Sequence, residues 1–144
     1  MIRIIAVGKV RDKRLAGLVD DYLKRIGGMA PVELAEVRDA TPAREGKDMV
    51  ARLGSVRGQQ LVVAMDELGE DLTSREFSAL LGGHGGISFL IGGADGLGAE
   101  VRTRADRTVR LSSMTLTHEM ARVFLAEQIY RGLSILRGKP YHRG

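Results

Sequence analysis

Short apolar runs alternate along the chain with longer segments in which apolar residues recur every three or four positions. The first kind of run is typical of buried β-strands and the second of amphipathic helices. The run at 87–93 (ISFLIGG) is apolar on both faces, which is typical of a central strand in a parallel sheet. Strands are predicted at residues 2–8, 32–37, 60–65, 87–93 and 107–112.

Helices are predicted from their end signals as well as from their periodicity. The first covers residues 15–26 and precedes a pair of glycines. The second begins after Thr41, which a proline follows, and Thr73 with Glu76 forms a capping box for the third. The last covers about 118–136 and is apolar around most of its circumference, as a helix in a core or at a subunit interface is.

Five strand-then-helix units predict an α/β fold, with a mostly parallel sheet and helices on both faces. The 144 residues contain no repeat, low-complexity tract or linker, so residues 1–144 are predicted to form a single domain. Ligands of such folds lie beyond the carboxyl ends of the strands. The segments that can carry a site are therefore 8–12, 66–71, 92–98 and 112–118.

Composition narrows the chemistry. The chain has no cysteine, which excludes disulfides, thiolate metal sites and thiol nucleophiles. No apolar run is long enough to span a membrane and the first residues lack the order of a signal peptide, so a cytoplasmic protein is expected. The net charge is +4, with basic clusters at 9–14 and 131–143. They form a phosphate-binding surface if the fold brings them together, and are otherwise scattered solvated side chains.

Two loops have unusual compositions. Segment 91–98 (IGGADGLG) lacks the third glycine of a dinucleotide fingerprint, and is either a place where backbone approaches a ligand or a tight turn. Segment 111–118 (LSSMTLTH) interleaves hydroxyl and apolar side chains, which suits a loop that holds a planar polar ring. Its other interpretation, compatible with the first, is a polar connection in which Thr117 caps the last helix.

The last helix and the terminus contain charged and aromatic groups that a simple core does not need. Glu127 and Arg131 stand four positions apart on one face and can pair. Because their neighbours are nearly all apolar we expect partial burial, and both a functional role and a structural ion pair fit. The chain then ends in PYHR (140–143), which is either a basic stub or a tail that folds onto something in need of those groups.

Four ordered motifs together resemble the RlmH family, small bacterial methyltransferases of the SPOUT class that methylate N3 of a pseudouridine in large-subunit ribosomal RNA. The motifs are LIGGADG, LSSMTLTH, LAEQIYRGLSI and terminal PYHR, and the similarity extends to AVGK at 6–9 and YLKRI at 22–26. The chain departs from the family at Ala94-Asp95, where a Pro-Glu pair is usual, and at Thr117, where proline is usual. Both departures concern loop rigidity more than chemistry.

The resemblance implies a C-terminal trefoil knot that forms the S-adenosylmethionine site, with no metal or second cofactor. It also implies a homodimer that acts on ribosomal RNA in the assembled ribosome. The lack of cysteine suits methylation of a ring nitrogen, since methylating carbon 5 of a pyrimidine normally needs a cysteine adduct. By matched position the cofactor would be lined by Met65, Gly92, Leu111, Ser112, Ser113, Met114, Thr115 and Leu116.

The terminal PYHR is expected to cross the dimer interface and complete the partner's active site. Tyr141 would contact the target base, Arg143 a phosphate, and His142 would assist proton transfer. Two other functions stay open: a SPOUT methyltransferase acting on transfer RNA, and a non-catalytic ribosome-associated RNA-binding module. The candidate catalytic residues are His142, Tyr141, Arg143, Glu127, Arg131 and His118.

Overall fold

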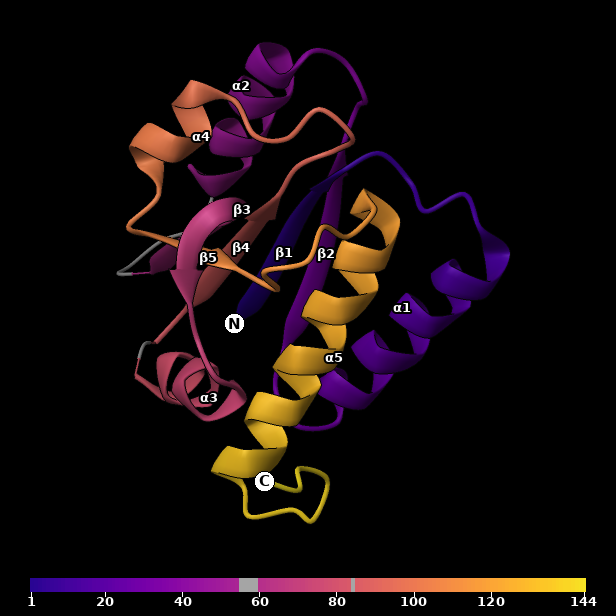
Figure 1. Ribbon diagram of the computed structural model, residues 1–144, viewed down its shortest axis with the longest axis vertical. Helices are drawn as coiled ribbons and strands as arrows, with labels where there is room; N and C mark the ends of the chain where they lie inside the picture. Colours follow the sequence, from indigo (N-terminus) through magenta and orange to yellow (C-terminus); the bar gives the residue numbers. More distant parts are fainter. Residues whose placement is uncertain (55–59, 84) are drawn as a thin grey trace.

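In the computed structural model, which describes residues 1–54, 60–83 and 85–144, a helix follows every strand (Figure 1). This alternation confirms the predicted α/β class. The strands are β1 (Ile2–Val7), β2 (Val32–Val37), β3 (Leu61–Asp71), β4 (Ile87–Ile91) and β5 (Arg107–Arg110). The helices are α1 (Lys13–Gly27), α2 (Pro42–Leu53), α3 (Ser74–Gly82), α4 (Ala99–Arg104) and α5 (His118–Leu136).

The five strands form one sheet in the order β2-β1-β4-β3-β5, and every pairing is parallel. Ile87 of β4 aligns with Ile2 of β1 on one side and with Leu61 of β3 on the other. All five residues of β4 are buried, which confirms the prediction of a central strand. The carboxyl ends of all the strands therefore meet at one edge of the sheet.

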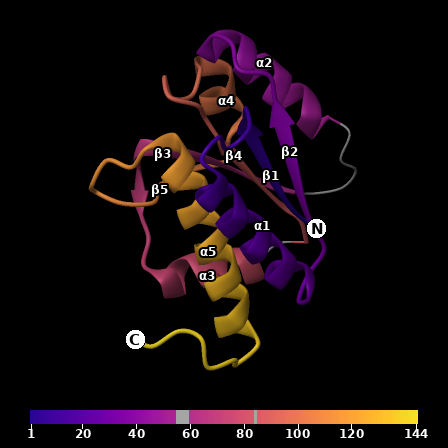
Figure 2. The same cartoon turned by 90° about the vertical axis from the view of Figure 1, so that its right-hand side faces the viewer.

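Two separate cores fill the two faces of the sheet. One contains Phe89 with the apolar faces of α1, α3 and α5, and the other contains Leu90 with those of α2 and α4. The alternation of side chains along β4 sends these neighbouring residues to opposite faces. Figure 2 shows α1 and α5 side by side over one face, with α2 and α4 grouped together away from them. The predicted coverage of both faces is confirmed.

The predicted helix caps are present. Thr41 Oγ1 accepts the amide hydrogen of Arg44 at 3.3 Å, and Thr117 Oγ1 accepts that of Met120 at 3.2 Å. Thr73 and Glu76 accept each other's amide hydrogens at 3.1 and 2.9 Å, which makes a complete capping box. Within the described ranges, no helix is both long and apolar enough to cross a membrane.

The short helix α4 was not located from the sequence. It is six residues long, begins after a glycine without a side-chain cap, and buries Val101 alone. The segment has no capping side chain at its start. It also has no periodic apolar face, because such a face needs more helical turns than α4 has. Its importance is that it carries Arg102 to the edge of the sheet, as described below.

Helices α1 and α5 run in the same direction, which separates the two basic clusters. Backbone amides just before α1 bind Glu119 in the first turn of α5, while Arg137 beyond the end of α5 binds the carbonyl of Met29 beyond the end of α1. The 19 residues of α5 span about 28 Å. Residues 9–14 thus lie at one end of the helix pair and the end of the 131–143 cluster at the other, so one chain does not form the combined phosphate-binding surface.

Candidate cofactor and catalytic site

Strand β3 interrupts its pairing with β5 at the carboxyl edge of the sheet and then resumes it. Met65 and Glu70 both align with Val109 of β5, so residues 66–69 bulge outward between two consecutive registers. The bulge falls within the predicted segment 66–71 and forms one wall of a cavity.

The turn after β4 forms the second wall. The Gly96 amide donates to the carbonyl of Gly93 at 3.1 Å, and Gly96 has a φ of +80°, which favours glycine. A Cβ on Gly92 would lie 2.7 Å from the carbonyl oxygen of Gly96. The tight-turn interpretation of this segment is therefore confirmed, and the same turn lines the cavity.

The loop between β5 and α5 closes a cavity of about 700 Å³, which we call the large cavity. This volume lies within the range of small-molecule sites. Ser113 is exposed and does not line the large cavity, in contrast to the expectation from the resemblance. The other expected cofactor residues and one expected catalytic residue do line it: Met65, Gly92, Leu111, Ser112, Met114, Thr115, Leu116 and His118.

Charged residues that had not been singled out also line the large cavity. Arg102 of α4 binds the nine-tenths buried side chain of Asp66 at 2.8 Å. Arg110 forms a two-pronged pair with Asp71, one contact of which is 2.6 Å, and this hydrogen bonding lowers the pKa of Asp71. Sequence spacing could not have found these pairs, because each joins residues about 40 positions apart.

The predicted segment 8–12 does not line the large cavity. The amides of Arg11 and Asp12 donate to the carboxylate of Glu119 at 2.8 and 3.2 Å, and these bonds lower the pKa of Glu119. The first turn of α5 thus fixes the position of this loop, and a site at the segment stays a prediction.

A buried arginine fixes the end of β1 in the same way. Arg122 donates to Glu36 at 2.6 Å and to the carbonyl oxygens of Val7 and Gly8 at 2.9 and 2.8 Å. Its side chain is 5% exposed, so the charge is neutralised inside the protein rather than by water. The sequence did not single out Arg122, because its partners Glu36, Val7 and Gly8 lie 86 to 115 positions away in the chain.

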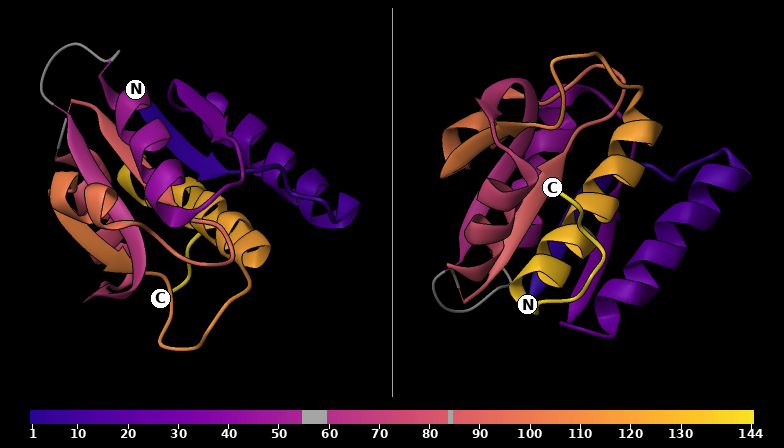
Figure 3. Two further views of the ribbon diagram at one scale, coloured as in Figure 1. Left: turned by 90° about the horizontal axis from the view of Figure 1, so that it is seen from above. Right: turned by 60° about the horizontal axis from the view of Figure 1, so that its bottom comes forward.

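Residues 137–144, which we call the tail, fold back along α5 of the same chain (Figure 3). The Tyr141 hydroxyl donates to Glu127 at 2.7 Å, and Glu127 pairs with Arg131 at 2.8 Å. Arg131 also contacts Nδ1 of His142 at 2.9 Å. The predicted Glu127–Arg131 pair and its partial burial are confirmed, with 19% and 24% of the side chains exposed. We call these four residues the tail cluster.

Burial, with hydrogen bonds to Tyr22 and Glu127, raises the pKa of Tyr141 well above its usual range. The phenol is therefore neutral at physiological pH and acts as a hydrogen-bond donor to Glu127. Arg143 is exposed, and His118 lies at the other end of α5, at the large cavity. The structure thus brings four of the six candidate catalytic residues together and leaves these two apart.

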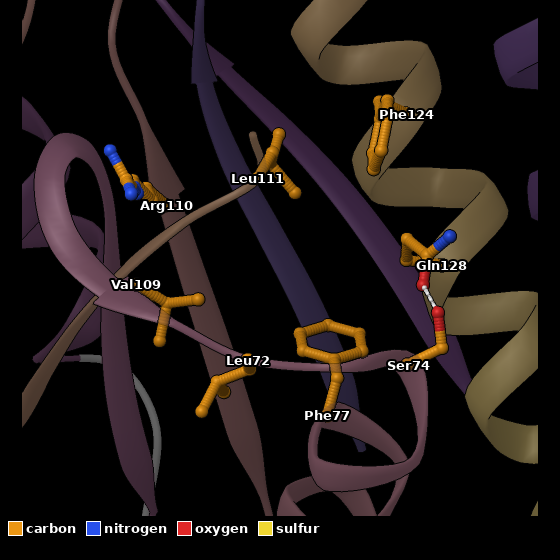
Figure 4. A pocket seen from close by; sticks show the side chains of 8 residues that line it. All are labelled: Leu72, Ser74, Phe77, Val109, Arg110, Leu111, Phe124 and Gln128. Atoms are coloured by element: carbon orange, nitrogen blue, oxygen red, sulfur yellow. Dashed lines mark hydrogen bonds between the residues drawn. The ribbon is translucent and has the colours of Figure 1, made fainter. Parts of the chain in front are cut away.

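A second cavity, of about 100 Å³, lies between α3 and α5 and is called the recess (Figure 4). It shares Arg110 and Leu111 with the large cavity. On its other side Ser74 donates to Gln128 at 2.7 Å, and Gln128 donates to Glu127 of the tail cluster at 2.8 Å. The recess therefore connects the two groups of candidate residues. It is lined by Leu72, Ser74, Phe77, Val109, Arg110, Leu111, Phe124 and Gln128.

No group of three or more potential metal ligands occurs in the part of the chain that the structure describes. The site is thus composed of glycine-rich backbone, hydroxyl and apolar side chains, and paired charges.

Comparisons with known proteins find similar sequences over nearly the whole chain. The family described as "Predicted SPOUT methyltransferase" matches residues 1–142. "Ribosomal RNA large subunit methyltransferase H" from a strain of Prochlorococcus marinus is 42% identical over 143 residues, which cover 98% of this chain and 94% of that one. The protein of the same name from a strain of Anaeromyxobacter dehalogenans is 40% identical over 151 residues, which cover 99% of each chain.

Solved structures share the fold at low sequence identity. A probable methylase family protein from Haemophilus influenzae superposes with a TM-score of 0.58 at 14% identity, and covers 99% of this chain and 70% of that one. The TrmH/SpoU tRNA modifying enzyme from A. aeolicus gives a TM-score of 0.52 at 13% identity, and covers 99% and 81%. These likenesses concern the fold alone.

Proposed function

The chain belongs to the SPOUT methyltransferase family, and on this premise we propose that it transfers a methyl group from S-adenosylmethionine to N3 of a pseudouridine in large-subunit ribosomal RNA. We further propose that it acts in the cytoplasm, as a homodimer, on the assembled ribosome. The observation that carries the proposal is about 40% identity over nearly the whole chain to proteins named as large-subunit ribosomal RNA methyltransferases.

The large cavity suits the chemistry of this cofactor, which supplies an already activated methyl group. The carboxylates of Glu67 and Asp95 line the cavity and complement an ammonium and a sulfonium, whereas Asp66 is already paired with Arg102. Arg102 and Arg110 are each paired with an aspartate and keep further guanidinium N–H groups that can donate to a carboxylate. The backbone of the glycine turn and of the loop at 111–117 supplies amides and carbonyls for a planar ring.

The remaining chemical task is to orient the ring nitrogen and to take its proton. An arginine can only donate, so Nδ1 of His142 accepts from Arg131 and carries no proton in this contact. We infer that Nδ1 becomes available as a base only when the tail leaves Arg131. The Tyr141 phenol, neutral and bound to Glu127, is a donor rather than a base in the same arrangement.

The proposed homodimer would give the tail a second destination. Of the residues that line the large cavity, none comes from the tail, because the cavity lies at the start of α5 and the tail follows its end. Most of the apolar surface of α5 is already buried within the chain, with Met120 and Leu136 left exposed near its two ends. Support for the dimer thus comes from the placement of the tail more than from an uncovered helix.

The test is transfer of a labelled methyl group to large ribosomal subunits from a strain that lacks the homologous enzyme. We expect one methyl group on N3 of a single pseudouridine, found by mass mapping of the RNA. Methylation of transfer RNA instead would favour the second enzyme function. A protein that binds the ribosome but gives no calorimetric signal with S-adenosylmethionine would be the non-catalytic module.

A further inference from the structure

We propose that the recess receives the target base and distinguishes pseudouridine from uridine through the hydroxyl of Ser74. The inference deepens the proposed function and rests on it. It follows from the position of the recess, from the chemistry of its walls, and from the direction of two hydrogen bonds.

The position of the recess suits a base that accepts a methyl group. Arg110 and Leu111 form walls of both the recess and the large cavity, so a ring in the first lies next to a cofactor in the second. A cavity of about 150 Å³ can hold one six-membered ring, and the recess, of about 100 Å³, can take part of such a ring.

The walls of the recess suit a planar ring with a polar edge. Phe77 and Phe124 provide aromatic surface, and Val109 and Leu111 provide apolar contacts. Unstacked bases are commonly held on such aromatic surfaces in complexes with RNA. Figure 4 shows Ser74 and Gln128 at one side of the recess, joined by their hydrogen bond.

The direction of that bond follows from the neighbouring carboxylate. Glu127 is held by Arg131 and Tyr141 and can only accept, so the Gln128 amide must turn its nitrogen toward Glu127. The Gln128 oxygen therefore faces Ser74, and the Ser74 hydroxyl must donate to it. With its single hydrogen committed, Ser74 Oγ can offer only lone pairs to a ligand in the recess.

An acceptor at this point distinguishes the two nucleosides. In pseudouridine the sugar is attached to carbon 5, so N1 carries a hydrogen, whereas in uridine N1 is attached to the sugar and carries none. N1 and N3 lie two atoms apart in the ring, so N1–H can donate to Ser74 while N3 faces the large cavity. Uridine in the same pose leaves Ser74 Oγ without its donor, which costs binding free energy.

The test compares subunits that carry pseudouridine with subunits from a strain that lacks the pseudouridine synthase, which carry uridine. We expect Ser74→Ala to lower kcat/KM for pseudouridine-bearing subunits at least about tenfold and to leave transfer to uridine-bearing subunits unchanged. Affinity for S-adenosylmethionine, measured by calorimetry, should not change. Thr103→Ala removes an exposed hydroxyl from α4 and serves as the matched control.

Two further variants keep the test decisive. Ser74→Thr retains an acceptor and should restore most of the preference for pseudouridine, whereas Ser74→Leu should fill the recess and block transfer to both kinds of subunit. If Ser74→Ala lowers both transfers equally or neither, the recess does not read N1–H. Failure of the wild-type protein to methylate any subunit would overturn the proposed function instead, so the two failures are distinguishable.

Discussion

At the scale of single residues, Tyr141 attaches the tail to α5 through a hydrogen bond to a charged acceptor. Tyr141→Phe removes this bond, and we expect it to lower the free energy of unfolding by about 1 kcal/mol. Tyr22→Phe is the control, since its hydroxyl contacts Tyr141 only at 3.5 Å. Urea denaturation should show a change within about 0.5 kcal/mol for that control.

We also expect the stabilisation by Tyr141 to depend on pH. The pKa of Tyr141 is about 10 in the unfolded chain and is higher in the folded protein. As the pH rises past about 10, the phenol therefore ionises in the unfolded chain before it does in the folded protein. Stabilisation by Tyr141 is therefore complete below pH ~10 and decreases as the pH rises above it. The stability difference between wild type and Tyr141→Phe should shrink from pH 9 to pH 11, and a constant difference would contradict the buried, neutral phenol.

Gly69 is a residue at which backbone passes close to backbone. A Cβ at this position would lie 2.7 Å from the carbonyl carbons of Thr108 and Val109, atoms that cannot move like the end of a side chain. We expect Gly69→Ala to destabilise the protein by about 2 kcal/mol and to weaken S-adenosylmethionine binding, because residues 66–68 of the same bulge line the large cavity.

At Gly17 we expect the same change, from glycine to alanine, to stabilise the protein instead. Apart from its chain neighbours and the backbone of its own helix, no atom lies within 4 Å of its added Cβ, and the residue is exposed within α1, so the variant should gain up to about 1 kcal/mol. Thermal unfolding of both variants measures the contrast. Equal effects would mean that β3 does not approach β5 as closely as described.

At the scale of secondary structure elements, Arg122 joins α5 to the ends of β1 and β2. Arg122→Met would leave Glu36 and two main-chain carbonyls without their donor, and should cost about 3 kcal/mol in denaturant unfolding. Arg44→Met removes an exposed pair with Asp48 and should cost about 0.5 kcal/mol or less. Similar costs for the two variants would contradict a specific role for the buried contacts.

Most elements could be predicted from the sequence because their signals are local. The capping box of Thr73 and Glu76 and the apolar run of β4 each depend on a few adjacent residues. The bulge in β3 could not be predicted, since it exists only through pairing with β5, which is distant in the chain. Helix α4 could not be predicted either. It is so short that it buries a single residue, and one apolar position makes no periodic pattern.

At the scale of the whole molecule, the site is an assembly of segments that no single motif describes. The resemblance located a part of the lining of the large cavity, namely Met65, Gly92, His118 and most of the stretch 111–116. It did not locate the recess, whose polar pair joins Ser74 of α3 to Gln128 of α5 across 54 positions. Ser113 of the same stretch is exposed and does not line the large cavity.

The proposed exchange of tails predicts a pattern of activity in mixed dimers. One lesion removes residues 140–144, and the other inactivates the large cavity, for example Leu116→Arg, which places a bulky charge in its lining. If the tail acts on the partner, lesions on opposite chains leave one working site and lesions on the same chain leave none. Labelled methyl transfer by purified mixed dimers measures the pattern.

The reverse pattern would show that each tail serves its own chain, as the contacts of Tyr141 and His142 within one chain allow. Dimerisation itself is checked by analytical ultracentrifugation. A mass near 15.6 kDa, that of one chain, at micromolar concentration would contradict the homodimer.

The strand order has a consequence for how the protein is synthesised. β1 emerges first but gains its second neighbour, β4, only after residue 87, and the core over α1 and α3 is closed by Leu125 and Ile129 of α5. Parallel pairing between distant segments forms slowly, so the nascent chain stays open until nearly its last residues have been made. A chain cut short before α5 would lack its core as well as its tail, and would be open to cellular proteases. Chains that survive to meet their substrate are therefore those in which α5 has been completed.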